Sequence, residues 1–552
     1  MADTLSRGRR AVVAHKTELF LFFLAMGLYI PGLAWDLPHA SGPDRVYLWA
    51  TDDISPLGPL TETYNTFVRG AANRWLTYPL AHHFILTIVY SPYLIWLMLI
   101  GRLAEPTAIY PFGFSDPVTT FRVLTVIARM VSIGMAAGTV TAAYRIGCIL
   151  WGRHTGLLAF IISLLPFPMF YYSHTANLEL PALFWISLAL MMYARILTDA
   201  LSATRAAWLA AFAALAAATK DQAAGVFLLL PLTLLPLHIQ SWKTKPAIWW
   251  RTPAALVASG AAVYALFSGL VLDPHRYFAH VQFSLYQNAT IRATYLEWFP
   301  FTLTGVIGLS SELLRLLDLV FGPLLLLAGI CGILHVSLRE RTRLAFALPA
   351  LSYVLSLIVI IHFVQIRYVM PLTFIFGIFA ARGVCLGLGY LPSLKLARAA
   401  AVLVICAWPL WLSVDLAFQM VNDSRHDAGT WLAIHMGPGS TLAHCGDIQS
   451  LPRVRSDVRI LHVSGNREWR HSMEEHRPDV VIMQPDWTSK PGMEHSRSCP
   501  EEFIKRVKDG SLGYGLAAAF KSRSSIRRQL LDYPSVNPAV RIFIKKSVPE
   551  KP

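Results

Sequence analysis

Two adjacent carboxylates, Asp52 and Asp53, directly follow an apolar segment in the stretch WATDDISPLGPL (residues 49–60). Ionisable side chains are costly near the centre of a bilayer, and those that persist there often mark a pathway or a reaction site. A carboxylate that faces water can act as a general base and take a proton from an attacking hydroxyl group. The alternative is structural, because either aspartate could cap a loop helix ahead of the turn residues SPLGPL.

The composition of the chain is that of a polytopic membrane protein. Of its 552 residues, 55% are hydrophobic and only 15% are charged, whereas soluble domains carry about 25% charged residues. The formal net charge is +15 at pH 7, but the basic residues form short clusters between apolar segments. This pattern follows the positive-inside rule and argues against a nucleic-acid-binding protein.

The basic clusters orient the apolar segments, because such clusters stay in the cytosol. They lie at the N-terminus and at 195–205, 243–251, 339–343 and 382–398. If the segment 79–101 also crossed the membrane, the later basic clusters would lie outside. This segment is therefore expected not to cross, and Pro79, His82, His83 and Pro92 interrupt it. We expect this segment to lie in the interface or to enter the bilayer only partly.

The sequence therefore predicts about eleven transmembrane helices in a plasma-membrane protein, with the N-terminus cytosolic and the C-terminal part outside. Residues 207–237 must hold two of them, which are expected to be short or buried in protein, with TKDQ (219–222) at the outer turn. The other spans are expected near 17–35, 121–150, twice within 155–194, and near 253–272, 313–336, 343–362, 369–387 and 399–419.

The polar tail at 421–552 predicts a small extracytoplasmic α/β domain that follows a membrane domain at 1–420. Short strand-like segments alternate with helical stretches such as 501–508. The segments are TLAHC, RILHVS, DVVIMQ and VRIFIKK. Cys445 and Cys499 lie in this tail, where an oxidising compartment would permit a disulfide. Two unpaired thiols are equally compatible with the sequence.

With this topology, the polar residues that interrupt apolar segments gather on the outer side of the membrane. They are Asp52, Asp53, His82, His83, Asn177, Glu179, Lys220, Asp221, Arg276, Arg367 and Tyr368. Taken singly, His82 could be interfacial, Glu179 a helix cap, Lys220 and Asp221 a neutralised pair, and Arg367 a side chain that snorkels to lipid head groups. Together they indicate a polar cavity that opens outward.

The order of these motifs resembles the GT-C class of membrane glycosyltransferases, in particular the branch of protein O-mannosyltransferases and the lipid A aminoarabinose transferase. ATDDISP is similar to the acidic pair of the first outer loop, here 36–120 with interfacial helices, although Asp53 stands where Glu is usual. YPLAH (78–82) loosely resembles a YPPLH-like motif and lacks its second proline.

Three later motifs extend the resemblance. YYSHTANLE is similar to a turn in which a Tyr-Tyr pair precedes an acid, which places Glu179 where Asp is more usual. ATKDQA resembles a Thr-Lys turn, and IRYVMP resembles an Arg-Tyr-x-x-Pro entry to a late span. NDSRHDAGTW resembles the start of the soluble tail that these enzymes often carry.

The resemblance implies that a sugar passes from a polyprenyl-phosphate donor to a lipid, glycan or protein acceptor on the outer face. Asp52 is then the candidate base, with Asp53 in support. The remaining candidates are Lys220, Arg367 and Tyr368 for the donor phosphate and Glu179, His82 and Asn177 for the second acid and the acceptor. Positive charge stabilises a departing phosphate, and displacement with a single base implies inversion at the anomeric carbon.

Alternatives remain open at this point. Asp52, Asp53, Glu179 and His82 could together bind a divalent cation, since oxygen-rich sets suit such ions, and members of the class differ in metal use; no other cofactor is predicted. A transporter or flippase of lipid-linked sugars could use the same cavity, but should show an inverted repeat, which the sequence does not show. A non-catalytic scaffold would leave the clustered ionisable groups unexplained.

Overall fold

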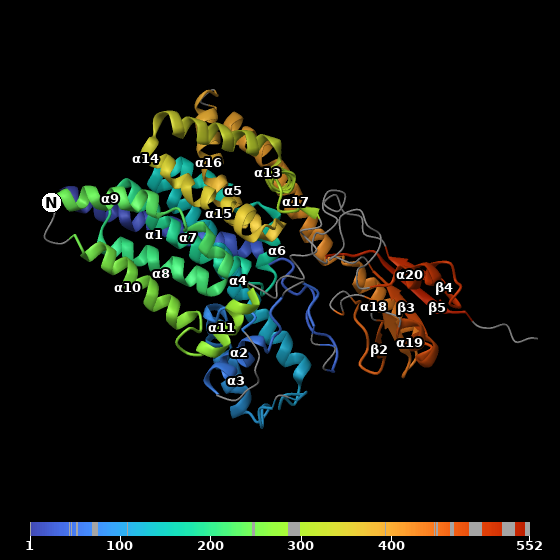
Figure 1. Cartoon of the computed structure of the whole chain (residues 1–552). Coiled ribbons are helices and arrows are strands. Elements are labelled where there is room, and N and C mark those ends of the chain that lie inside the picture. The colour runs from blue at the N-terminus through green and yellow to red at the C-terminus, as the bar shows by residue number, and fades with distance from the viewer. Residues whose placement is uncertain are drawn as a thin grey trace, which may run out of the picture. The chain divides into compact units, whose positions relative to one another are not determined.

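The structure is a computed structural model of the chain, and it divides into two compact units (Figure 1). The first unit comprises Met1–Pro31, Gly58–Val89 and Ala128–Ser413, and the second comprises Gly32–Leu57, Tyr90–Ile127 and Val414–Pro552. The described residues are 2–42, 45, 47–50, 53–68, 76–107, 109–244, 249–284, 298–391, 394–445, 448, 451–463, 468–484, 499–520 and 536–546. The second unit thus includes parts of the predicted outer loop, and the predicted boundary at 420 stays a prediction.

Helices form most of the chain before the C-terminal sheet. The α-helices are α1 (Ala2–Tyr29), α2 (Gly58–Phe67), α3 (Ala81–Leu99), α4 (Pro117–Trp151), α5 (Arg153–Leu164), α6 (Phe167–Ser173), α7 (Glu179–Thr198), α8 (Ala203–Thr219), α9 (Pro231–Thr244), α10 (Arg251–Phe267), α11 (Pro274–Gln282), α13 (Leu303–Arg339), α14 (Arg341–Leu344), α15 (Leu348–Leu355), α16 (Met370–Gly389) and α17 (Lys395–Val421). Shorter turns are η2 (Asp221–Val226), η5 (Ala345–Ala347), the π-helical η6 (Ser356–Ile361) and η7 (Ile366–Val369).

Several of these helices are long and apolar enough to cross a membrane. Within the described residues, seven segments qualify, namely Ala81–Leu99, Pro117–Trp151, Glu179–Thr198, Leu303–Arg339, Arg341–Ile361, Ile366–Gly389 and Lys395–His435. The pair α5 and α6, bent by 64° at its break, makes up to eight if it counts as one span. The predicted helical membrane architecture is therefore confirmed in outline. The count of eleven, and the prediction that 79–101 does not cross, stay predictions.

The region that was expected to hold two short spans does contain two short helices. α8 has 17 residues and α9 has 14, with η2 between them. α8 begins where the Ser202 hydroxyl accepts a hydrogen bond from the Arg205 backbone N–H, and it ends at Lys220, whose backbone is extended. α8 packs between α7 and α10 (Figure 1). This packing places Lys220 at a turn on the far end of α8 from Ser202.

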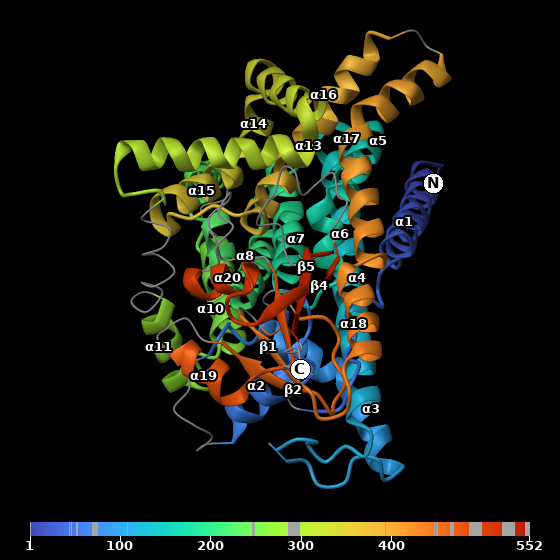
Figure 2. The same ribbon diagram turned by 90° about the vertical axis from the view of Figure 1, so that its right-hand side faces the viewer.

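The second unit contains a five-stranded sheet with the strand order β2-β1-β3-β5-β4. The strands are β1 (Thr441–His444), β2 (Arg459–His462), β3 (Val480–Met483), β4 (Tyr514–Phe520) and β5 (Val540–Lys545). β1 pairs in parallel with β2 and β3, whereas β5 is antiparallel to β3 and β4. Figures 1 and 2 show β4 beside β5 at one edge. The predicted small α/β domain is thus present.

Both faces of the sheet are covered, because side chains alternate along each strand. One face packs Leu442, Ile482 and Ile542 against Leu432 of α18 (Ser424–His435). The other packs Val481 and Phe543 against α19 (Glu468–His476) and α20 (Glu501–Lys508). A disulfide joins Cys445 to Cys499, with the Cα atoms 5.4 Å apart. The question that the sequence left open for these cysteines is therefore answered in favour of the bond.

The start of α18 holds a fully buried ion pair within the second unit. The Arg425 guanidinium lies 2.7 Å from the Asp423 carboxylate, and both side chains have no exposed surface. Arg425 stacks over the Trp49 ring at 4.0 Å, and the Trp35 indole N–H donates to Asp423 at 3.2 Å. These contacts explain why residues 32–57 form a compact unit with the C-terminal tail.

Candidate active site

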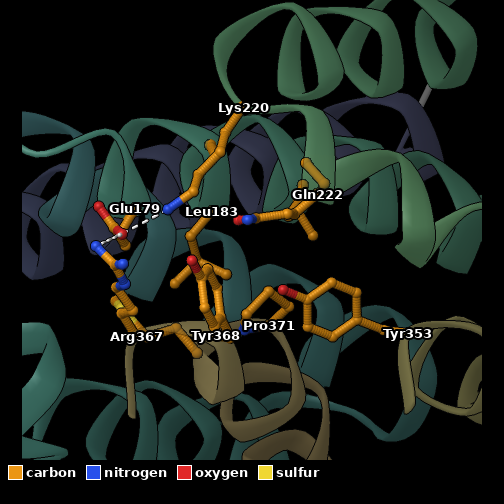
Figure 3. A pocket seen from close by; sticks show the side chains of 12 residues that line it. Glu179, Leu183, Lys220, Gln222, Tyr353, Arg367, Tyr368 and Pro371 are labelled. Carbon is orange, nitrogen blue, oxygen red and sulfur yellow. Dashed lines mark hydrogen bonds and ion pairs between the residues drawn. The ribbon is translucent and has the colours of Figure 1, made fainter. Parts of the chain in front are cut away.

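Three charged side chains converge inside the first unit. The Lys220 Nζ lies 2.5 Å from Oε1 of Glu179, and the Arg367 Nη1 lies 3.9 Å from the same oxygen. Lys220 and Arg367 approach the carboxylate from opposite sides, as Figure 3 shows. The sequence had identified all three residues separately, and the structure brings them into one cluster.

Glu179 is positioned by the turn between α6 and α7. The His174 ring nitrogens contact the carbonyl oxygens of Phe170 and Pro31, each at 2.6 Å, which fixes the chain after the Tyr-Tyr pair. Asn177 is buried in the same turn. Glu179 then opens α7, where a carboxylate is favoured by the positive end of the helix dipole. The polar turn therefore directs one carboxylate into the protein interior.

Arg367 is positioned by a break ahead of α16. The backbone is left-handed at His362 and extended at Gln365, and η7 carries Arg367 and Tyr368. Pro371 lies in the first turn of α16, where its fixed φ suits the start of a helix. α7 and the segment Ile366–Gly389, which joins η7 and α16, are largely buried by protein. The cluster thus lies among packed helices.

The ring of Tyr368 supports both cations. The Lys220 Nζ lies 5.2 Å and the Arg367 Cζ 5.0 Å from the ring centroid, within the range of cation–π attraction. Tyr353 and Gln222 line the same pocket. Tyr353 lies inside a predicted apolar span, so the sequence did not mark it as part of a site. Figure 3 shows Gln222 and Tyr353 on one side of Tyr368 and the contact between Glu179 and Arg367 on the other.

The pocket is small, and its three charged side chains are largely buried. The exposed fractions of the side chains are 5% for Glu179, 10% for Lys220 and 22% for Arg367. The cavity volume is about 20 Å³, which is room for roughly one water molecule. A phosphate group must therefore displace the Glu179 carboxylate or separate the pocket walls.

A second polar network ties α11 to the turn that carries Lys220. The His280 Nε2 lies 2.9 Å from the Asp221 carboxylate, and His280 Nδ1 lies 2.7 Å from the Leu76 carbonyl oxygen. On the same helix, Arg276 forms a buried ion pair with Glu62 of α2. Asp221 therefore pairs with His280 while Lys220 pairs with Glu179. The alternative in which Lys220 and Asp221 neutralise each other is wrong.

Asp53 and His82, two further candidate residues, are not among the lining residues of the ion-cluster pocket. Asp52 lies outside the described residues, and Asp53 is a half-buried residue of the second unit whose backbone N–H donates to the Ala50 carbonyl at 3.2 Å. His82 is fully buried in the first turn of α3, is absent from the lining of the ion-cluster pocket, and has no hydrogen-bond partner among the described residues.

A divalent-cation site is not assembled within the described part of the chain. There, no group of three or more His, Cys, Asp or Glu side chains could hold a metal ion. Glu179, one member of the predicted set, instead neutralises Lys220. Since Asp52 lies outside the described residues, a metal site that includes the acidic pair stays a prediction.

No family model and no curated protein matches this sequence. Solved structures do resemble the fold. The oligosaccharyltransferase of Archaeoglobus fulgidus in the apo form has 12% identity and a TM-score of 0.45, over 85% of this chain and 69% of that chain. ArnT from Cupriavidus metallidurans bound to undecaprenyl phosphate has 13% identity and a TM-score of 0.41, over 96% of this chain and 97% of that chain.

The arabinofuranosyltransferase AftD from Mycobacteria has 16% identity and a TM-score of 0.40, over 98% of this chain and 40% of that chain. These three neighbours are GT-C glycosyltransferases, the class that the sequence motifs resemble. TM-scores below 0.5 do not assign an activity to this chain.

Proposed function

We propose that this protein is an integral-membrane glycosyltransferase of the plasma membrane. It moves a sugar from a polyprenyl-phosphate donor to an acceptor hydroxyl group on the outer face. The observation that carries the proposal is the convergence of Lys220 and Arg367 on one carboxylate, Glu179, in a largely buried pocket. Two cations that meet at one point suit a phosphate group, because charge-assisted hydrogen bonds from Lys and Arg to phosphate are strong.

In the proposed reaction, the acceptor oxygen attacks the anomeric carbon of the donor sugar. The bond between that carbon and the phosphate oxygen breaks, and its electron pair leaves with the phosphate. Asp52 accepts the proton of the acceptor hydroxyl group, as a general base does. Because the leaving group is a stable anion, no general acid is needed. A single displacement inverts the configuration at the anomeric carbon.

Lys220 and Arg367 hold the leaving phosphate and stabilise the charge that grows on it. Arg367 offers a planar fork and Lys220 a point charge, so the two are not interchangeable. The Tyr368 ring, about equally distant from both cations, keeps them oriented. Their contacts with Glu179 make this carboxylate the balancing charge before the donor binds.

The other proposed roles concern the acceptor and the acidic pair. Asp53 supports the loop that carries Asp52. Glu179, once displaced from the cations, is free to orient the acceptor together with Asn177 of the same turn and His82. The acceptor is a lipid, a glycan or a protein.

The test is a transfer assay with purified protein in proteoliposomes. The donor is a polyprenyl phosphate with a radiolabelled sugar, and the acceptors are lipid, glycan and protein fractions of the cell envelope. We expect release of polyprenyl phosphate and label in one acceptor fraction, and loss of both in Arg367→Ala. Arg315→Ala is the matched control, because Arg315 pairs with Glu312 on the surface of α13. Movement of intact donor across the bilayer without bond cleavage would instead identify a transporter.

A further inference from the structure

A second cavity lies between α7 and α8, at the ends of these helices that are remote from the ion cluster. It has a volume of about 560 Å³, and its lining includes Arg195, Ser202, Arg205, Trp208 and Phe212. Glu179 and Arg195 are about 24 Å apart along α7 at a rise of about 1.5 Å per residue. This separation approaches the roughly 30 Å of a bilayer core. The cavity is therefore distinct from the candidate active site.

The cavity has the form of a groove along α8, and the end of this groove at the loop between α7 and α8 is cationic. Arg205 already pairs with Asp199 at 2.8 Å and donates to the Ala200 carbonyl at 2.7 Å. Arg195 is half-buried, and no carboxylate of the described residues lies within ion-pair distance of its guanidinium. The first turn of α8, capped by Ser202, adds the positive end of a helix dipole. Within the described part of the chain, this end of the groove thus has one cation without a paired carboxylate, at a site suited to an anion.

The other end of the groove is apolar. Trp208 is 53% exposed, and its ring stacks on Phe212 with the centroids 5.4 Å apart. Phe212 in turn stacks on Trp185 at 6.2 Å. From Arg205 to Phe212 the groove follows α8 for about 10 Å. An exposed tryptophan beside arginines is typical of the interface between a bilayer and water.

We propose that this groove binds an anionic phospholipid of the cytoplasmic leaflet. The lipid phosphate lies at Arg195 and the start of α8, and the first methylene groups of an acyl chain lie along Trp208 and Phe212. A free phosphate would fill only the polar end. A zwitterionic lipid would bring its own cation next to Arg195 and Arg205. The placement in the cytoplasmic leaflet agrees with the predicted cytosolic position of 195–205.

The test uses quenching of tryptophan fluorescence by brominated lipids in phosphatidylcholine nanodiscs. The signal of Trp208 is the difference between the wild type and Trp208→Phe. We expect brominated phosphatidylglycerol to quench this signal at a mole fraction roughly tenfold lower than brominated phosphatidylcholine requires, which corresponds to about 1.4 kcal/mol. Equal quenching by the two lipids would overturn the proposal.

Variants of Arg195 test whether its charge, and not a change in folding, determines the preference for the anionic lipid. Arg195→Gln should remove most of the preference for phosphatidylglycerol, and Arg195→Lys should retain part of it. Arg339→Gln is the matched control, because Arg339 is an exposed arginine in the last turn of α13 and is not part of the groove. An unchanged preference in Arg195→Gln would contradict the assignment. Displacement of the lipid by sn-glycerol 3-phosphate would contradict it as well, because it would assign the site to a soluble phosphate.

Discussion

Replacement of Glu179 by glutamine should lower the free energy of unfolding and raise the affinity of the protein for the donor phosphate. The carboxylate now neutralises Lys220 at 2.5 Å and faces Arg367 at 3.9 Å, inside a cavity of about 20 Å³. A phosphate must compete with this carboxylate for both cations. The amide has nearly the same size but no charge, so the variant removes the competitor without enlarging the pocket.

The structure sets the scale of both effects. At an effective dielectric constant of about 20, charges 3.9 Å apart attract each other by about 4 kcal/mol. Removal of one member of a buried pair destabilises a protein by about 3–5 kcal/mol, and Glu179 and Lys220 are both buried. We therefore expect the free energy of unfolding to fall by about 3 kcal/mol. Donor affinity should rise about tenfold or more, which is about 1.4 kcal/mol.

The assay measures binding of polyprenyl phosphate to purified protein, together with thermal unfolding with and without this lipid. Glu179→Gln should have a lower Tm alone and a larger Tm increase on addition of the lipid. Glu340→Gln is the control, because Glu340 accepts hydrogen bonds from Trp151, Arg343 and Arg382 and is no part of the pocket. Weaker binding of the lipid by Glu179→Gln would refute the view that this carboxylate competes with the phosphate.

Three further predictions concern the base, the pH dependence and the topology. Asp52→Asn should lower turnover by at least about 10²-fold, and Asp53→Asn by only about tenfold; an inactive Asp53→Asn with an active Asp52→Asn would make Asp53 the base. Burial lowers the pKa of His280, but the hydrogen bond and charge of Asp221 outweigh burial, so this pKa is raised. The pair therefore stabilises the fold below the unfolded pKa of about 6.5, and this contribution is lost as pH rises through the folded pKa. His280→Gln should reduce the loss of Tm between about pH 6 and about pH 8, and a loss equal to that of the wild type would contradict this view. A cysteine that replaces Ser393 should not be labelled by an impermeant maleimide added from outside. Labelling would show that this loop lies outside and would contradict the predicted topology.

Much of the C-terminal fold could be predicted from the sequence, because short apolar segments alternate there with polar stretches, and two of the strands, β3 and β5, are rich in β-branched residues. The predicted helix at 501–508 coincides with α20, and the predicted strand segments match β1, β2, β3 and β5. β4 (Tyr514–Phe520) was missed, because its residues GLAAA have little intrinsic preference for a strand. Its pairing with β5 determines its conformation.

The site was visible in the sequence only where charges interrupt apolar segments. Glu179, Lys220 and Arg367 were found in this way. Tyr353 was not, because a tyrosine in an apolar segment reads as part of a span until the helices are packed. The Glu62–Arg276 pair joins residues 214 positions apart, so no local pattern could reveal it. The number of transmembrane helices depends on whether each helix is long enough to cross the bilayer. The positions of the basic clusters do not give this length.

Lys220 and Arg367 are the residues that we propose bind the phosphate of a polyprenyl donor. The most direct measurement compares the affinity of the purified protein for polyprenyl phosphate and for the uncharged polyprenol of the same chain length. We expect a clear preference for the phosphate in the wild type and its loss in the double variant Lys220→Met and Arg367→Gln, with polyprenol binding unchanged. Equal affinity of the wild type for the two lipids, or a preference that survives in the double variant, would contradict this proposal.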